Sequence, residues 1–194
     1  MRRNMHYLVV MFVIGVSAAA FFGFGVRSAK SGKYSTAEIQ RGKYLVSTAG
    51  GCNDCHTPHV LTSGGLVNDS TRLLSGAPSD EKVPVIPDGI IGSEGWSMLQ
   101  SNDETTFAGP WGVSFAANLT PDKATGIGSW TEKMFIECLH DGKYWATGRE
   151  LLPPMPWEEM GKMSDNDLRD IYAYLMSIKP VSNVVPSPVP PKQQ

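Results

Sequence analysis

The stretch GGCNDCHTPH, residues 50–59, decides how this sequence is interpreted, because it brings Cys52, Cys55 and His56 close together. Two residues separate the cysteines, so a single helical turn would place both sulfur atoms on one side of the chain. Three kinds of site use such residues: a thiol redox pair, a zinc site and a covalently attached haem. The rest of the sequence distinguishes among them.

The surrounding sequence disfavours the first two kinds of site. A thioredoxin-like pair opens a helix in a βαβ unit, whereas here a predicted helix precedes the cysteines and loop-like sequence follows them. A zinc site would combine both cysteines with Cys138 and His140. Cys138 falls on the apolar face of its predicted helix, where a free cysteine is usually a buried hydrophobic residue, and His140 points elsewhere.

A covalently attached haem accounts for all three residues of the motif. Two cysteines at this spacing form thioethers with the vinyl groups on adjacent pyrroles, and the next residue ligates the iron. The run C-x-x-C-H is the signature of c-type haem attachment. The sequence therefore predicts one covalently bound haem c, with its iron, at Cys52, Cys55 and His56.

The second axial ligand of the iron is predicted to be Met155, in the stretch LLPPMPW. Prolines on both sides restrict its backbone and hold the side chain out at low entropic cost. A thioether ligand makes a low-spin electron-transfer centre, whereas an open position invites oxygen or peroxide chemistry. Met160 and Met163 are the alternative ligands, and filling a gap in the core is the alternative role of Met155.

The N-terminal segment predicts export. Arg2 and Arg3 precede an uncharged, mainly apolar stretch, residues 7–26. A basic start, an apolar core and small residues near Ala20 are typical of a signal peptide, and about 20 apolar residues also suffice for a membrane anchor. Residues 1–29 are thus a signal peptide or a membrane anchor with a short tether. Either alternative places the domain in the periplasm, soluble or tethered to the inner membrane.

Helical patterns occupy three stretches of the remaining chain. The first begins at Ser35 with a capping box and stops at Gly50-Gly51; the second begins with a capping box at Ser129 and ends at Gly142; the third covers residues 164–179. Residues 60–115 show no lasting apolar periodicity, which predicts loops with at most one short hairpin.

These segments predict an all-α fold, with three to four helices around one haem and long loops, over residues 30–180. The Pro-rich residues 181–194 should form an extended or disordered tail. A composition of 41% hydrophobic and 19% charged residues is typical of a globular domain. The formal net charge of −2 does not favour binding to nucleic acid.

Four segments, in order, resemble class I c-type cytochromes: RGKYLVSTAGGCNDCHTP, ANLTPDKATGIGSWTEKMF, LLPPMPW and DLRDIYAYLMSI. More narrowly, the chain is similar over about residues 38–180 to the monohaem modules in cytochrome subunits of periplasmic alcohol, gluconate and aldehyde dehydrogenases. The resemblance implies a cytochrome c-like fold, thioether links at both cysteines, and His56 and Met155 as the axial ligands.

The resemblance also implies particular supporting contacts. Gly42 should let the last helix cross closely near Tyr174, and the Pro58 carbonyl should orient the second ring nitrogen of His56. Asn118 and Thr120 are candidates for a haem propionate or else turn residues. Further candidates for propionate pairing or pocket packing are Arg72, Trp111, Arg149 and Trp157.

The expected function is electron transfer rather than enzymatic catalysis. The protein would carry single electrons between a dehydrogenase and a downstream cytochrome or oxidase of the respiratory chain. With a single attachment motif, it would pass electrons on by docking. Two alternatives stay open: a haem enzyme of the peroxidase type with a labile distal ligand, and a structural or sensor haem subunit.

Overall fold

The computed structural model describes residues 33–92 and 94–191. The predicted signal or anchor segment, residues 7–26, lies outside the described residues. Within the described ranges, no helix has both the length and the apolar character needed to cross a bilayer.

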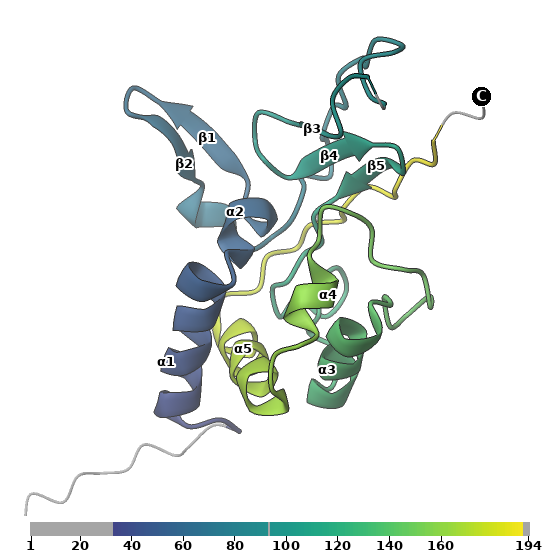
Figure 1. Ribbon diagram of the computed structural model, residues 1–194. Coiled ribbons are helices and arrows are strands. Elements are labelled where there is room, and N and C mark those ends of the chain that lie inside the picture. Colours follow the sequence, from purple (N-terminus) through teal and green to yellow (C-terminus); the bar gives the residue numbers. More distant parts are fainter. Residues whose placement is uncertain (1–32, 93, 192–194) are drawn as a thin grey trace, which may run out of the picture. The chain divides into compact units, whose positions relative to one another are not determined.

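The first helix, α1 (Thr36–Tyr44), begins as its sequence predicts (Figure 1). The Ser35 hydroxyl accepts a hydrogen bond from Glu38 N at 3.3 Å, and the Glu38 carboxylate accepts one from Ser35 N at 2.7 Å. This reciprocal pair satisfies two backbone donors that the first turn leaves free, and it confirms the predicted capping box. The helix continues into a short π-helix, η1 (Leu45–Ala49).

Helix α3 (Glu132–Asp141) begins two residues later than its sequence suggests. Its N-cap is Thr131, so the prediction that Ser129 caps this helix was wrong. A turn closed by a hydrogen bond from Trp130 N to Ile127 O (3.0 Å) occupies the preceding residues. The chain can therefore become helical only after this turn.

Helix α5 (Asp165–Ser177) packs against α1 at Gly42, which is buried. A Cβ at Gly42 would overlap the carbonyl oxygen of Asp170 and lie 2.9 Å from the Cβ of Tyr174. The absence of a side chain thus permits backbone-to-backbone contact between the first and last helices. The close crossing that the resemblance implies is confirmed.

The hydrophobic core lies among these helices and the loops between them. Helix α3 packs against α5, and the segment formed by α1 and η1 covers another face of α5. Burial of large apolar side chains contributes about 1.5–3 kcal/mol each. The buried cluster consists of Leu45, Val46, Leu74, Ile127, Phe135, Leu139, Met160, Leu168, Ile171, Tyr172, Tyr174 and Leu175.

The predicted all-α fold needs correction, because residues 59–115 form two small antiparallel sheets (Figure 1). The first is a hairpin of β1 (His59–Thr62) and β2 (Gly65–Asn68). The second pairs β3 (Leu99–Gln100), β4 (Thr106–Gly109) and β5 (Gly112–Phe115) in that order. The described chain is therefore helical with some sheet.

Two glycines make the hairpin turns possible. Gly65 (φ +106°) and Gly112 (φ +96°) occupy backbone conformations that residues with a Cβ rarely adopt. The strands contain only two to four residues each. Alternation over so few positions is too short to reveal a strand from sequence.

Residues 181–191 run extended after α5. Val189 forms an antiparallel bridge with Val113 of β5, through hydrogen bonds of 2.8 and 2.9 Å. The end of the described chain thereby adds to the edge of the larger sheet.

We predict that Gly42→Ala destabilises the protein, because the new methyl group meets the α5 backbone rather than a flexible side chain. The free energy of unfolding should fall by about 3 kcal/mol, the upper part of the range for overpacked cores. Chemical denaturation of the protein measures this change. Gly64→Ala is the control, since its nearest neighbour would be the Thr62 hydroxyl at 3.7 Å. Equal stability of both variants would contradict the close crossing.

Candidate haem site

The two cysteines and the histidine lie on α2 (Cys52–His56), a helix of little more than one turn. Gly51, in a left-handed conformation (φ +60°), redirects the chain from η1 into this helix. Both cysteines are free and partly exposed, and Cys52 packs against the hydrophobic cluster. His56 is buried. The structure thus brings the three predicted residues together on one short helix.

The environment of the thiols disfavours a redox pair. Burial raises the pKa of Cys52 to about 11. Burial also raises the pKa of Cys55, and the negative charges of Asp54 and Glu104 add to this effect. Reactive redox thiols need a lowered pKa that favours the thiolate. As free thiols, both groups stay protonated at neutral pH.

The alternative zinc site is not assembled. Cys138 is buried in α3, and burial raises the pKa of its thiol. Both ring nitrogens of His140 are occupied, with Nδ1 2.7 Å from Gly161 O and Nε2 2.9 Å from a carboxylate oxygen of Asp165. Across residues 33–92 and 94–191, no group of three His, Cys, Asp or Glu side chains is placed to hold a metal ion.

The imidazole of His56 is held by the main chain. Its Nδ1 lies 2.8 Å from Ala117 O. A carbonyl oxygen only accepts hydrogen bonds, so Nδ1 carries the proton and Nε2 keeps its lone pair. Burial lowers the pKa of His56 and so favours the neutral ring, while the hydrogen bond to Ala117 O has a smaller, opposing effect. Neutral imidazole with a free Nε2 is the form that binds metal ions.

The acceptor for His56 is not Pro58, and that implication of the resemblance was wrong. The Pro58 carbonyl instead accepts a hydrogen bond from Asp69 N at 2.8 Å. Strand β1 begins at the next residue and pairs with β2, whose end brings Asp69 back to the base of the hairpin. Hairpin closure therefore uses the Pro58 carbonyl, and the loop containing Ala117 supplies the contact to the ring.

Gly76 lies directly against this hydrogen bond. Its N–H donates to His56 O at 2.8 Å, and its φ is +75°. A Cβ at this position would lie 2.6 Å from the carbonyl carbon of Ala117 and 2.7 Å from its oxygen. Sequence reasoning missed Ala117, because a backbone carbonyl has no residue-type signal, and it missed Gly76, because nothing local distinguishes it among 20 glycines.

Met155 is partly buried and packs against the same hydrophobic cluster as Cys52. Strand β5 contacts the segment that precedes Met155 in the sequence. The Ser114 hydroxyl donates a 2.6 Å hydrogen bond to Pro153 O, and Trp111 Nε1 donates to the Ser114 hydroxyl at 3.1 Å. Trp111 thus braces the methionine segment through Ser114, a residue that sequence reasoning missed.

The alternative methionines occupy different environments. Met160 ends the short helix α4 (Trp157–Met160) and belongs to the buried cluster. Its methyl group lies beside Gly50, just before the attachment helix. Met163 is partly buried against the same cluster. Trp157 covers Gly142 at the end of α3, where a Cβ would overlap its ring.

Asn118 and Thr120 are engaged within the protein. The Asn118 side-chain oxygen accepts hydrogen bonds from Thr120 N (2.9 Å) and Thr120 Oγ1 (2.7 Å), and its nitrogen donates to Val181 O (2.8 Å). Both residues are buried. These contacts support their role as turn residues rather than as ligands of a propionate.

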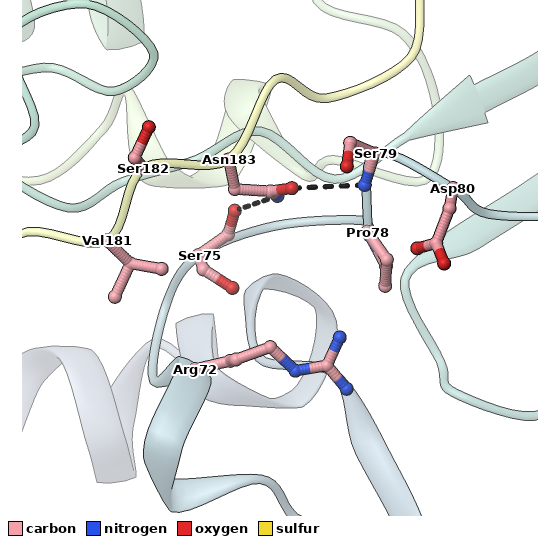
Figure 2. Close-up of a pocket in the computed structure, with 8 residues that line it drawn as sticks. All are labelled: Arg72, Ser75, Pro78, Ser79, Asp80, Val181, Ser182 and Asn183. Atoms are coloured by element: carbon pink, nitrogen blue, oxygen red, sulfur yellow. Dashed lines mark hydrogen bonds between the residues drawn. The ribbon is translucent and has the colours of Figure 1, made fainter.

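The two candidate arginines are also engaged. Arg72 pairs with Asp69 at 2.8 Å, and the Arg149 guanidinium donates to Glu150 O at 2.8 Å. Arg72 lines the pocket shown in Figure 2, which has a volume of about 190 Å³. Ligand pockets usually measure about 300–1,000 Å³, so this pocket is too small for a haem. Besides Arg72, the pocket is lined by residues from two segments, 75–80 and 181–183.

Two polar atoms near the motif are buried without a hydrogen-bond partner in the described structure: Asn53 Oδ1 on α2 and His59 Nδ1 at the start of β1. Buried polar groups in folded proteins are nearly always paired. Both atoms flank His56 in the sequence, and the described residues supply a hydrogen-bond partner to neither.

No protein-family model matches the chain. A nicotinate dehydrogenase subunit of Pseudomonas putida is 30% identical to it over 156 residues, which is 80% of this chain and 10% of that protein. The fructose dehydrogenase cytochrome subunit of Gluconobacter japonicus is 39% identical over 80 residues, 41% of this chain and 16% of that protein. The cytochrome c subunit of a Gluconobacter oxydans quinone alcohol dehydrogenase is 38% identical over 74 residues, 38% of this chain and 15% of that protein.

The chain thus spans between 10% and 16% of the length of these relatives. Further cytochrome c subunits of alcohol and gluconate dehydrogenases match it at 36–37% identity. The chain is homologous to cytochrome c modules of dehydrogenase subunits, and the resemblance drawn from its four segments is confirmed.

We predict that Gly76→Ala loosens the contact between His56 and Ala117. The new methyl group would displace the carbonyl, so the variant should lose about 1–3 kcal/mol more stability than a matched control. Gly148→Ala is that control, since Gly148 has a similar φ of +67° and open space around it. The shift of the His56 Nδ1 proton resonance measures the contact directly. An unchanged resonance would contradict the placement of Gly76.

Proposed function

We propose that this chain is a monohaem cytochrome c that transfers single electrons, with haem bound through Cys52 and Cys55 and iron ligated by His56 and Met155. The observation that carries the proposal is the C-x-x-C-H run on α2, with the His56 ring held so that Nε2 is available. Haem supplies the one-electron change between ferrous and ferric iron. The side chains supply attachment, orientation and exclusion of water.

On the histidine side, the protein contributes orientation. The Ala117 carbonyl accepts the hydrogen bond from Nδ1. The opposite ring nitrogen, Nε2, therefore points away from the loop that contains Ala117. Such a hydrogen bond fixes the tautomer and raises the basicity of a ligating imidazole. Because the ring is buried, water competes poorly for it.

On the methionine side, the protein contributes a restrained segment. Prolines flank Met155, and Ser114 holds the Pro153 carbonyl. A ligand held in place by its surroundings changes little in position when the iron changes charge. A thioether ligand also raises the reduction potential relative to a second imidazole.

The names of the relatives support a dehydrogenase as the electron donor. We propose that electrons leave to a downstream cytochrome or oxidase of the respiratory chain, and that the protein has no substrate of its own. It would act in the periplasm, either soluble or tethered to the inner membrane through residues 7–26. This sequence has one attachment motif, and we propose that each electron leaves by docking to another protein.

The first test is the mass of protein matured in a host that attaches c-type haem. We expect the polypeptide plus one haem, and a large loss of haem in Cys55→Ser. Cys138→Ser is the matched control and should keep its full haem content, because Cys138 is buried on α3, away from the attachment helix in sequence. A colourless protein with the mass of the bare polypeptide would refute the proposal.

The second test concerns the distal ligand. Met155→Ala should remove the weak band near the red edge of the ferric spectrum, which arises from sulfur bound to iron. Axial ligands move haem potentials over about 0.8 V, so we expect the potential to fall by on the order of 0.1 V. Met163→Leu should leave both unchanged. An unaltered spectrum in Met155→Ala would refute this ligand, and a high-spin wild-type spectrum would favour a peroxidase-type haem.

A further inference from the structure

The extended residues 181–190, here called the C-terminal strap, are tied to three separate parts of the structure. Figure 1 shows this segment in yellow, running from the end of α5 past β5. The sequence predicts an extended or disordered tail here. Its hydrogen bonds instead reach the loop that orients His56 and the strand that holds the Met155 segment.

The first connection lies next to the acceptor of His56. Asn118, which follows Ala117 directly, donates hydrogen bonds from its side chain to Val181 O (2.8 Å) and Asn183 O (3.4 Å). Val181 N in turn donates to the Thr120 hydroxyl at 3.1 Å. The strap therefore fixes the turn that carries the Ala117 carbonyl.

The second connection comes from the Asn183 side chain, as Figure 2 shows. Its nitrogen donates to Ser75 O and Ala77 O, both at 2.8 Å, and its oxygen accepts from Ser79 N at 3.0 Å. The first two partners flank Gly76, which lies against the Ala117 carbonyl. One side chain of the strap thus holds the second segment that borders the His56 contact.

The third connection is on the methionine side. Val189 exchanges two backbone hydrogen bonds with Val113, at 2.8 and 2.9 Å. The next residue of β5 is Ser114, whose hydroxyl holds Pro153 O, two positions before Met155. The far end of the strap therefore restrains the strand on which the methionine segment depends.

We propose that the C-terminal strap is a positioning element for both axial ligands, Asn183 acting on His56 and Val189 acting on Met155. This inference rests on the proposed haem function. A thioether is a neutral and weak ligand, so its retention on iron depends on a surrounding chain that does not move. Loosening the strap should make Met155 easier to replace on the iron, and it should change the hydrogen bond that orients the His56 ring.

The methionine side is tested by a chain that stops after Pro186, which keeps Asn183 and removes Val189. We expect at least a tenfold faster binding of imidazole to the ferric iron and a weaker sulfur band. Val189→Pro removes the N–H donor while keeping the carbonyl acceptor, and it tests the same contact in the full-length chain. A chain that stops after Pro191 keeps every strap contact named here and is the control.

The histidine side is tested by Asn183→Ala, with Ser182→Ala as the control because Ser182 is an exposed neighbour. We expect a shift of the His56 Nδ1 proton resonance and of the midpoint potential in Asn183→Ala alone. All measurements are made well below the unfolding transition, so that a general loss of stability does not contribute.

Unchanged imidazole binding, resonance and potential in the folded variants would overturn the inference, while a sulfur band in the wild-type protein would leave the proposed function intact. Absence of that band in the wild-type protein would instead overturn the proposed ligand pair. A general fall in stability without a change in these three readouts would show that the strap serves packing only.

Discussion

The hydrogen bond between His56 Nδ1 and Ala117 O is the constraint on which the candidate site depends. Helix α2 is too short to orient the ring by itself, so the direction of Nε2 is decided by a carbonyl far away in the chain. Holding that carbonyl requires the turn at Asn118, the glycine at position 76 and the residues that follow the last helix. These irregular segments therefore have a structural role, because they hold the acceptor of this one hydrogen bond.

Helices and strands divide the work of building the site. The helices supply a rigid core, against which Cys52 and Met155 both pack. The larger sheet supplies Ser114, which holds the segment in front of Met155, and it offers an edge on which the C-terminal residues pair. The residues between the attachment motif and α3, which look featureless in sequence, therefore contribute a support that helices alone would not provide.

Local patterns predicted much of the frame, because they act through neighbouring residues. The capping box at Ser35, the helix stop at Gly142 and the close crossing at Gly42 are all present. One short hairpin was expected in residues 60–115, and β1 and β2 form one. The three-stranded sheet was missed, since strands of two to four residues are too short to show alternation. Ala117 and Ser114 were missed for a related reason: a carbonyl has no residue-type signature, and one serine resembles any other. The roles of His56 and Met155 as iron ligands remain predictions.

The contact of Gly42 with Asp170 also has a consequence for the order of events during biosynthesis. It joins the first helix to the last, so the packing of α1 is complete only after α5 has been synthesised. Once α5 docks, Cys52 lies against the completed core. Chain topology thus delays the packing of Cys52 against the core until the last helix is in place, while both cysteines keep some exposure in the folded protein.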